Sequence, residues 1–215
     1  MKRITIAFCA AAFLFACNSE DKKVEEPKIA SATSETKVID EWVPVDSAAA
    51  EKAWMEYMTP GEAHKMLAKA DGEWDGEMTM WMAPDAPPMT SKIKGTNKMT
   101  MGGRYQVSSF KGNFMGMPFE GVSTTAFDNA KKTYINTWID NMGTGLMTME
   151  GTWNDASKAI SFKGKMICPA NGKECDVRET YQIIDNDTHL MTMYGPDMKT
   201  GKEYKNMEIK FNRRK

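Results

Sequence analysis

Methionine is the residue of this chain with the clearest potential for chemistry, because it occurs 20 times in 215 residues. A Met-Thr-Met triplet is repeated four times, at 78–80, 99–101, 147–149 and 191–193. Residues two positions apart share one face of a β-strand, so each triplet would present two thioethers on the same side. Thioethers are soft, flexible and apolar, which suits a hydrophobic pocket, ordinary core packing, or a site for a soft ion such as Cu(I).

A hydrophobic pocket is the hypothesis that gives a role to most of these residues. Glu179 has the strand parity of Val177 and Tyr181, which predicts that its carboxyl points inward and would anchor the polar end of a ligand. Trp138 would orient the ligand from another strand. The predicted lining comprises Met78, Met80, Met99, Met147, Met149, Met191, Met193, Trp138 and Glu179.

A soft-metal site is the alternative, because His189 has the same parity as Met191 and Met193 and could complete a copper-binding group. The second histidine, His64, stands among charged residues and is interpreted as a solvated helical residue. The chain contains no Gly-x-Ser-x-Gly, His-Glu-x-x-His or phosphate-binding glycine motif. We therefore predict neither an enzyme nor a cofactor.

The first 16 residues have the pattern of an export signal. Lys2 and Arg3 precede an apolar run that is too short to cross a bilayer as a helix. The Leu-Phe-Ala before Cys17 resembles the lipobox of bacterial lipoproteins, which implies that Cys17 is lipidated and becomes the mature N-terminus. The sequence thus predicts a protein of the cell envelope, lipid-anchored to the outer membrane on its periplasmic face or on the cell surface.

The mature chain is predicted to consist of a spacer and one domain. Residues 17–46 are acidic and poor in large apolar side chains, which is typical of a flexible spacer. Loss of residues 1–16 removes two of the 28 basic residues and none of the 29 acidic ones. The resulting net charge of 26 minus 29, or −3, argues against a nucleic-acid partner. Residues 47–215 have the length of a single domain, which we expect to be a monomer.

Cys168 and Cys175 are the other cysteines of the predicted mature chain. The residues between them have the composition of a hairpin turn, which would bring the two strands and both sulfurs together in an oxidising compartment. We predict a disulfide here, with a metal or redox pair as the alternative.

The remaining pattern is that of strands preceded by helices. Apolar and polar residues alternate from Gly72 onward, and turn signals separate about ten such runs. This predicts a mainly β fold, an antiparallel up-and-down β-barrel, with a two-layer β-sandwich as the alternative. Before the strands, the pattern predicts a helix over 48–58 and a second one that runs from a capping box at Thr59–Glu62 to about Ala70.

Several short motifs resemble those of a bacterial family, domain of unknown function 1579. They are Gly72-Glu73-Trp74, Gly103-Arg104-Tyr105, Pro118 to Gly121, Phe127-Asp128, Thr137-Trp138-Ile139-Asp140 with Thr144-Gly145, and Arg213. The resemblance covers roughly residues 54–213 and implies no activity, because the family has no assigned reaction.

A wider resemblance is to the calycins, which include the lipocalin, fatty-acid-binding and nitrobindin-like barrels. In these proteins the tryptophan of a Gly-x-Trp on the first strand packs against an arginine from the last strand. Gly72, Trp74 and Arg213 match those positions, which implies a barrel closed at one end by Trp74 and Arg213. The function we expect is binding of a small hydrophobic or amphipathic ligand, with soft-metal binding or a filled-core interaction module as alternatives.

Overall fold

The computed structural model describes residues 42–215, and the predicted export signal, Cys17 and all but the last residues of the predicted spacer lie outside this range. Helix α1 (Ser47–Met58) begins after Asp46, whose carboxylate accepts hydrogen bonds from the backbone N–H groups of Ala48 and Ala49. None of the α1 residues is buried. The predicted first helix is therefore confirmed to within one residue.

Helix α2 (Glu62–Ala68) is shorter than predicted. It begins after Gly61, whose N–H donates to Nδ1 of His64 at 3.1 Å, and Thr59 does not cap it. The Thr59 hydroxyl instead donates to the carbonyl of Met55 in the last turn of α1. The predicted start was wrong because the same threonine also fits the end of the preceding helix, where a side-chain donor satisfies an unpaired carbonyl.

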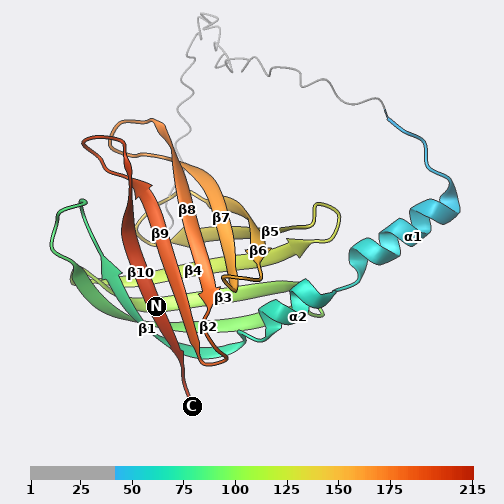
Figure 1. Ribbon diagram of the computed structural model, residues 1–215, viewed down its shortest axis with the longest axis horizontal. Helices are drawn as coiled ribbons and strands as arrows, with labels where there is room; N and C mark the ends of the chain where they lie inside the picture. Colours follow the sequence, from blue (N-terminus) through green and yellow to red (C-terminus); the bar gives the residue numbers. More distant parts are fainter. Residues whose placement is uncertain (1–41) are drawn as a thin grey trace, which may run out of the picture. The chain divides into compact units, whose positions relative to one another are not determined.

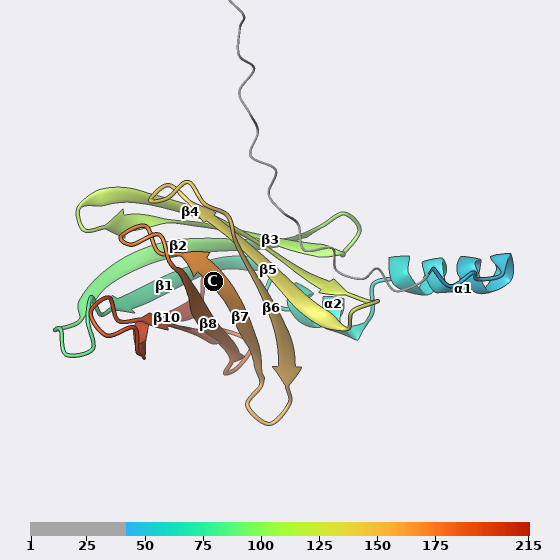
Figure 2. The same ribbon diagram turned by 90° about the horizontal axis from the view of Figure 1, so that it is seen from above.

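Ten antiparallel strands follow and close into a barrel (Figures 1 and 2). Each strand pairs with its neighbour in sequence, and the last strand pairs with the first, so the prediction of an up-and-down barrel is confirmed and the sandwich is excluded. The strands are β1 (Gly72–Met80), β2 (Met89–Thr100), β3 (Tyr105–Phe114), β4 (Met117–Asp128), β5 (Thr133–Asp140), β6 (Met147–Asn154), β7 (Ala159–Ile167), β8 (Glu174–Ile183), β9 (Thr188–Pro196) and β10 (Glu203–Arg213).

The register of β1 shows why the alternation found in the sequence produces this fold. Trp74 pairs with Arg213 of β10 and Gly95 of β2, and Met78 pairs with Ile209 and Ser91. Trp74 and Met78 are buried while the acidic residues between them are exposed. Period-two alternation thus turns one set of side chains into the barrel and the other into solvent.

The barrel interior contains two apolar clusters. The β5–β8 cluster is built from buried residues of those strands and α2, namely Leu67, Tyr134, Met149, Ile160, Phe162 and Val177. The β1–β10 cluster lies across the closing strands and consists of Trp74, Met78, Ile93, Ile209 and Phe211. These two clusters supply most of the buried apolar surface that stabilises the fold.

The two ends of the barrel differ in structure. At the first, which we call the helix end, α2 contacts β2, β3 and β4 (Figure 1). At the second, which we call the open end, the connections are the five hairpin loops at 81–88, 115–116, 141–146, 168–173 and 197–202. The tightest is Met115-Gly116, where positive φ values of 51° and 86° match a two-residue hairpin turn.

No helix within residues 42–215 has the length and apolar character needed to cross a bilayer.

Candidate ligand-binding site

The helix end is closed by a tryptophan and an arginine. Trp74 is 1% exposed, and its indole N–H donates to the carbonyl of Ala70 at 2.9 Å. The guanidinium of Arg213 lies 4.3 Å from the centre of the Trp74 ring, a cation–π distance. Arg213 also donates to the carbonyls of Lys69 and Asp71 at 2.7 and 2.6 Å, so it ties the last strand to the segment between α2 and β1.

His189 packs against the inner side of this closure. Its ring centre lies 4.4 Å from that of Trp74, and its Nδ1 is 2.7 Å from the hydroxyl of Tyr181. Burial, and then the charge of Arg213, lower the pKa of His189 to about 4. The imidazole is therefore neutral at pH 7, and it shares one hydrogen bond with the Tyr181 hydroxyl, whose direction is set by the imidazole tautomer.

Other polar side chains inside the barrel near this end also have partners. Gln106 donates to the carbonyl of Leu67, and Asn97 donates to that of Ala70. Asn136 of β5 donates to the hydroxyls of Ser123 and Thr125. Buried polar groups are normally paired in this way because desolvation without a partner is costly.

Glu179 of β8 does not follow this pattern. Its neighbours across the sheet are Phe162 and Met193, which places it on the inner face. No side chain or backbone N–H within residues 42–215 donates a hydrogen bond to its carboxyl, and burial raises its pKa from 4.5 to about 7. Glu179 nevertheless retains some accessible surface. Because Glu179 points into the barrel and keeps part of its surface accessible, we infer that it borders interior space that the side chains do not fill.

Asn206 of β10 provides a second unpaired polar atom on the same wall. The register of β10 shifts between Lys205 and Met207, as in a β-bulge, and the Asn206 side chain lies over the inner side of Gly195. Its Oδ1 is buried and has no hydrogen-bond partner among the described residues. Met207 pairs with Met193, and Met193 pairs with Glu179, so both unpaired groups belong to the wall formed by β8, β9 and β10.

The predicted methionines all lie inside, but they are divided between the two clusters. Met78 and Met149 are buried, at 7% and 1% exposure, whereas the other five keep partial accessibility. The β5–β8 cluster contains Met99, Met147, Met149 and Met193, and the β1–β10 cluster contains Met78, Met80 and Met191. Met193, the cross-strand neighbour of Glu179, is one of these partly accessible thioethers, so the interior beside Glu179 is not fully packed.

A pocket of about 170 Å³ lies at the open end, between β1, β2 and the β3–β4 hairpin. Met78 and Met80 from the predicted lining contribute to it, together with Met89, Phe114 and Met115. The sequence analysis did not select Met89 or Met115, because they lie outside the Met-Thr-Met triplets. Their position shows that the apolar lining extends to this opening.

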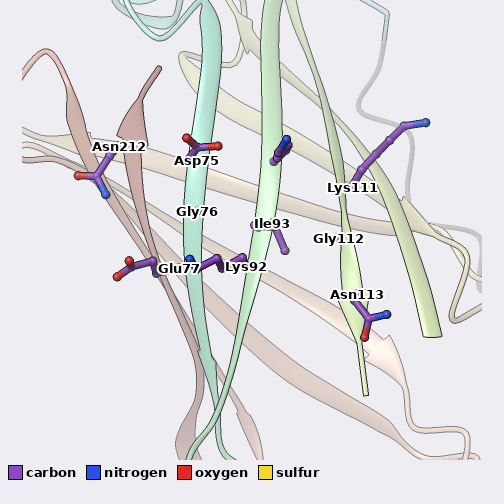
Figure 3. A pocket seen from close by; sticks show the side chains of 10 residues that line it. Asp75, Gly76, Glu77, Lys92, Ile93, Lys111, Gly112, Asn113 and Asn212 are labelled. Carbon is purple, nitrogen blue, oxygen red and sulfur yellow. The ribbon is translucent and has the colours of Figure 1, made fainter. Parts of the chain in front are cut away.

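A larger groove of about 700 Å³ has a different character (Figure 3). It is lined by exposed charged residues of β1, β2 and β3, including Asp75, Glu77, Lys92 and Lys111, and by none of the predicted methionines. Opposite charges face each other across it, since Glu77 pairs with Lys92 in the register. This groove on the outer surface is lined by two acidic and three basic side chains, and the sequence analysis did not predict it.

Trp138 is held by contacts on both sides of its ring. Its indole N–H donates to Oδ2 of Asp140 at 2.7 Å, and the other carboxylate oxygen of Asp140 accepts from the N–H of Met142. The ring lies over Gly121, where any Cβ would collide with it, and within 5.7 Å of the Phe110 ring. Trp138 is thus a fixed part of the wall, and its donor is already used.

The cysteine pair differs from the prediction, because both thiols are free. Cys175 pairs with Met166 and Cys168 lies opposite Lys173, so the two cysteines are offset by two residues rather than directly opposed. The Cys168 sulfur contacts the sulfur of Met198 at 3.8 Å instead. A disulfide would require the two side chains to turn toward each other along this diagonal, and it stays a prediction.

Both histidines, His64 and His189, are buried. His64 is 5% exposed and packs edge-on against Phe127, so its interpretation as a solvated residue was wrong. The residues of the copper alternative are distributed over different surroundings, with His189 bonded to Tyr181 and with Met191 and Met193 in different clusters. No group of three or more His, Cys, Asp or Glu side chains in residues 42–215 is arranged as a metal site.

The chain belongs to the family described as Protein of unknown function (DUF1579), whose model matches residues 59–213. The resemblance inferred from the sequence motifs is confirmed. No curated protein matches the sequence.

The fold is similar to that of known calycin-like barrels. The crystal structure of Rv2717c from M. tuberculosis aligns with a TM-score of 0.56 at 13% identity, covering 73% of this chain and all of that one. The S-type phycobiliprotein lyase CPES from Guillardia theta aligns with a TM-score of 0.52 at 8% identity, covering 75% of this chain and 97% of that one. At these identities the likeness concerns the fold alone.

Proposed function

We propose that the barrel binds a small hydrophobic or amphipathic molecule, which would enter from the open end and lie along the methionine side chains. The observation that carries this proposal is Glu179, whose carboxyl has no hydrogen-bond donor within residues 42–215 although its side chain points into the barrel and keeps part of its surface accessible. An unpaired carboxyl in such a place is costly for folding alone. A bound molecule or water that pairs with it would remove the cost.

The methionines support the apolar part of this proposal. Five of the seven predicted lining residues keep partial accessibility although they point inward. Thioether side chains adapt to ligands of irregular shape because they rotate about several bonds and are polarisable. A barrel of similar fold is by its name a phycobiliprotein lyase, and this likeness supports a ligand-binding role for the present barrel.

Binding of a neutral apolar fluorophore, 1-aminoanthracene, to the purified full chain tests the proposal. We expect saturable binding with one site per chain, a blue-shifted emission, and displacement by 1-decanol. Met193→Phe, which would fill the interior, should weaken binding at least tenfold. Leu190→Phe is the matched control, because Leu190 lies on the same strand with the opposite parity. Lack of saturable binding, or equal loss in both variants, would refute the proposal.

We further propose that the protein is an envelope lipoprotein, which rests on the predicted export signal and on Cys17. Metabolic labelling with an alkyne-bearing fatty acid should label the chain in its own host. The labelled protein should begin at Cys17, because the export signal is removed. Cys17→Ser should abolish the label and move the protein from the membrane to the soluble fraction. Retention of the label in that variant would contradict lipidation at Cys17.

A further inference from the structure

Two interior polar side chains on the wall formed by β8, β9 and β10, Glu179 and Asn206, have oxygen atoms without a hydrogen-bond donor. An ionised Glu179 offers two acceptor oxygens and no donor, and Asn206 leaves its Oδ1 unpaired. Of the neighbouring groups, Tyr181 shares one hydrogen bond with His189 and the indole N–H of Trp138 bonds to Asp140. The Nδ2 of Asn206 and the hydroxyl of Tyr134 form no hydrogen bond within residues 42–215, and neither group carries a charge at neutral pH. Among these groups Glu179 is the one that ionises to a negative charge near neutral pH, so this wall favours a positively charged partner.

Positive charge is missing from the same space. Every lysine of residues 42–215 is exposed except Lys205, which pairs with Glu208 and lies over the Trp81 ring. Arg178 pairs with Glu203 on the outer face, and Arg213 is held by carbonyls at the helix end. No lysine or arginine of the described strands therefore lies beside Glu179 to bind an acidic head group.

We propose that the barrel selects ligands whose head group is a hydrogen-bond donor carrying positive charge, a primary alkylamine being the simplest, and that it rejects fatty-acid carboxylates. An ammonium has three donors and no acceptor, which complements Glu179 and Asn206. A carboxylate would place like charge against Glu179 in surroundings of low dielectric constant. This inference rests on the proposed function and names the class of ligand.

The raised pKa of Glu179 is consistent with this selection. Burial without a cation disfavours the ionised carboxyl, and an ammonium bound beside it would favour ionisation and lower the pKa again. Near pH 6, where much of Glu179 is protonated, binding of an amine should therefore release protons. A ligand with a neutral head group should release none.

The test uses three molecules with the same ten-carbon tail, decylamine, 1-decanol and decanoate, in calorimetric titrations of the full chain at pH 8. We expect decylamine to bind at least tenfold more tightly than 1-decanol, and decanoate at least tenfold more weakly. Glu179→Gln should reduce the affinity for decylamine about tenfold and leave that for 1-decanol within threefold. Glu77→Gln, an exposed carboxylate on the outer face of β1, is the control.

Titrations of decylamine at pH 6 in two buffers of different ionisation enthalpy measure the number of protons released on binding. This number would not depend on Glu179 if that residue had only a structural role. Wild type should release protons and Glu179→Gln should not. Equal affinities for the three molecules would overturn the selection while leaving the proposed function standing. Lack of binding of all three would instead refute the proposed function.

Discussion

The helix end and the wall formed by β8, β9 and β10 differ in whether their inward-facing polar side chains have partners. At the helix end, Trp74, Arg213 and His189 all have defined partners within a few ångströms. On the wall, Glu179 and Asn206 point inward without partners in the described chain. Structural sites satisfy their polar groups, and a binding site leaves some of them for the ligand. The helix end therefore closes the barrel, and the wall formed by β8, β9 and β10 is where a ligand would be recognised.

The largest expected effect is at the closure. Trp74→Ala removes a fully buried ring together with its hydrogen bond to Ala70 and its contacts with Arg213 and His189. We expect the free energy of unfolding to fall by about 4 kcal/mol, as for other buried aromatic residues. Urea denaturation measures this loss. Trp54→Ala, at 62% exposure in α1, is the control and should change stability by less than about 0.5 kcal/mol.

On the wall, replacing the acid should stabilise the protein. The folded chain holds a proton on Glu179 up to about pH 7 that the unfolded chain loses near pH 4.5, so stability decreases as the pH rises through this interval. At pH 8 the ionised carboxyl costs about 3 kcal/mol. Glu179→Gln should therefore raise the free energy of unfolding by about 3 kcal/mol at pH 8 and change it little at pH 4. An equal effect at both pH values would contradict the raised pKa.

His189 should show the opposite pH dependence, which separates the two regions in one experiment. Its folded pKa of about 4 lies below the ordinary value of 6.5, so its contribution to stability is complete above pH 6.5 and is lost as the pH falls toward 4. Between pH 4.5 and 6.5 the effects of Glu179 and His189 oppose each other in wild type. In Glu179→Gln, stability should rise with pH over this range; a flat profile would show that His189 does not titrate as inferred.

A pair of methionine variants sharpens the same contrast. Met149 is 1% exposed within the β5–β8 cluster, and Met193 points inward beside Glu179 with part of its surface accessible. Met149→Ala should cost about 3 kcal/mol of stability, as expected for a packed core residue. Met193→Ala should cost only about 1 kcal/mol but weaken binding of 1-decanol at least fivefold. Equal costs in urea denaturation would mean that the interior is uniformly packed.

The smallest effect concerns the cysteines. If Cys168 and Cys175 form the predicted disulfide after export, mass spectrometry of the native chain without reductant will show a loss of two hydrogens. Because the bond would close only a short hairpin, its reduction should lower stability by no more than about 2 kcal/mol. Two free thiols in protein from the envelope fraction would show that the offset register seen in the structure persists.

The sequence predicted those features that depend on alternation and on local turn chemistry. The parity of Trp74, Met78 and Met149 follows from their own strands, so their burial could be inferred without the fold. The unpaired Oδ1 of Asn206 could not, because it depends on the irregular register between β9 and β10. Likewise, the offset of Cys168 from Cys175 is fixed by how β7 and β8 pair, which hairpin composition alone does not determine.

The burial of His64 and the hydrogen bond from Thr59 to the Met55 carbonyl were not predicted, for a related reason. Both lie where α1 and α2 meet the loops at the helix end, and the side chain of Asn129 in the β4–β5 loop donates to carbonyls of Tyr57 and Thr59 there. Such contacts join residues about 70 positions apart. Local propensity therefore gave the presence of each helix but not the details of its packing.

The central claim, that the space beside Glu179 holds a ligand, is tested most directly by native mass spectrometry of the full chain released gently from its own host's membranes. We expect wild type to retain a non-protein mass, and we expect this mass to be lost or greatly reduced in Glu179→Gln and in Met193→Phe. A bare polypeptide that also takes up neither decylamine nor 1-decanol when they are added would contradict it.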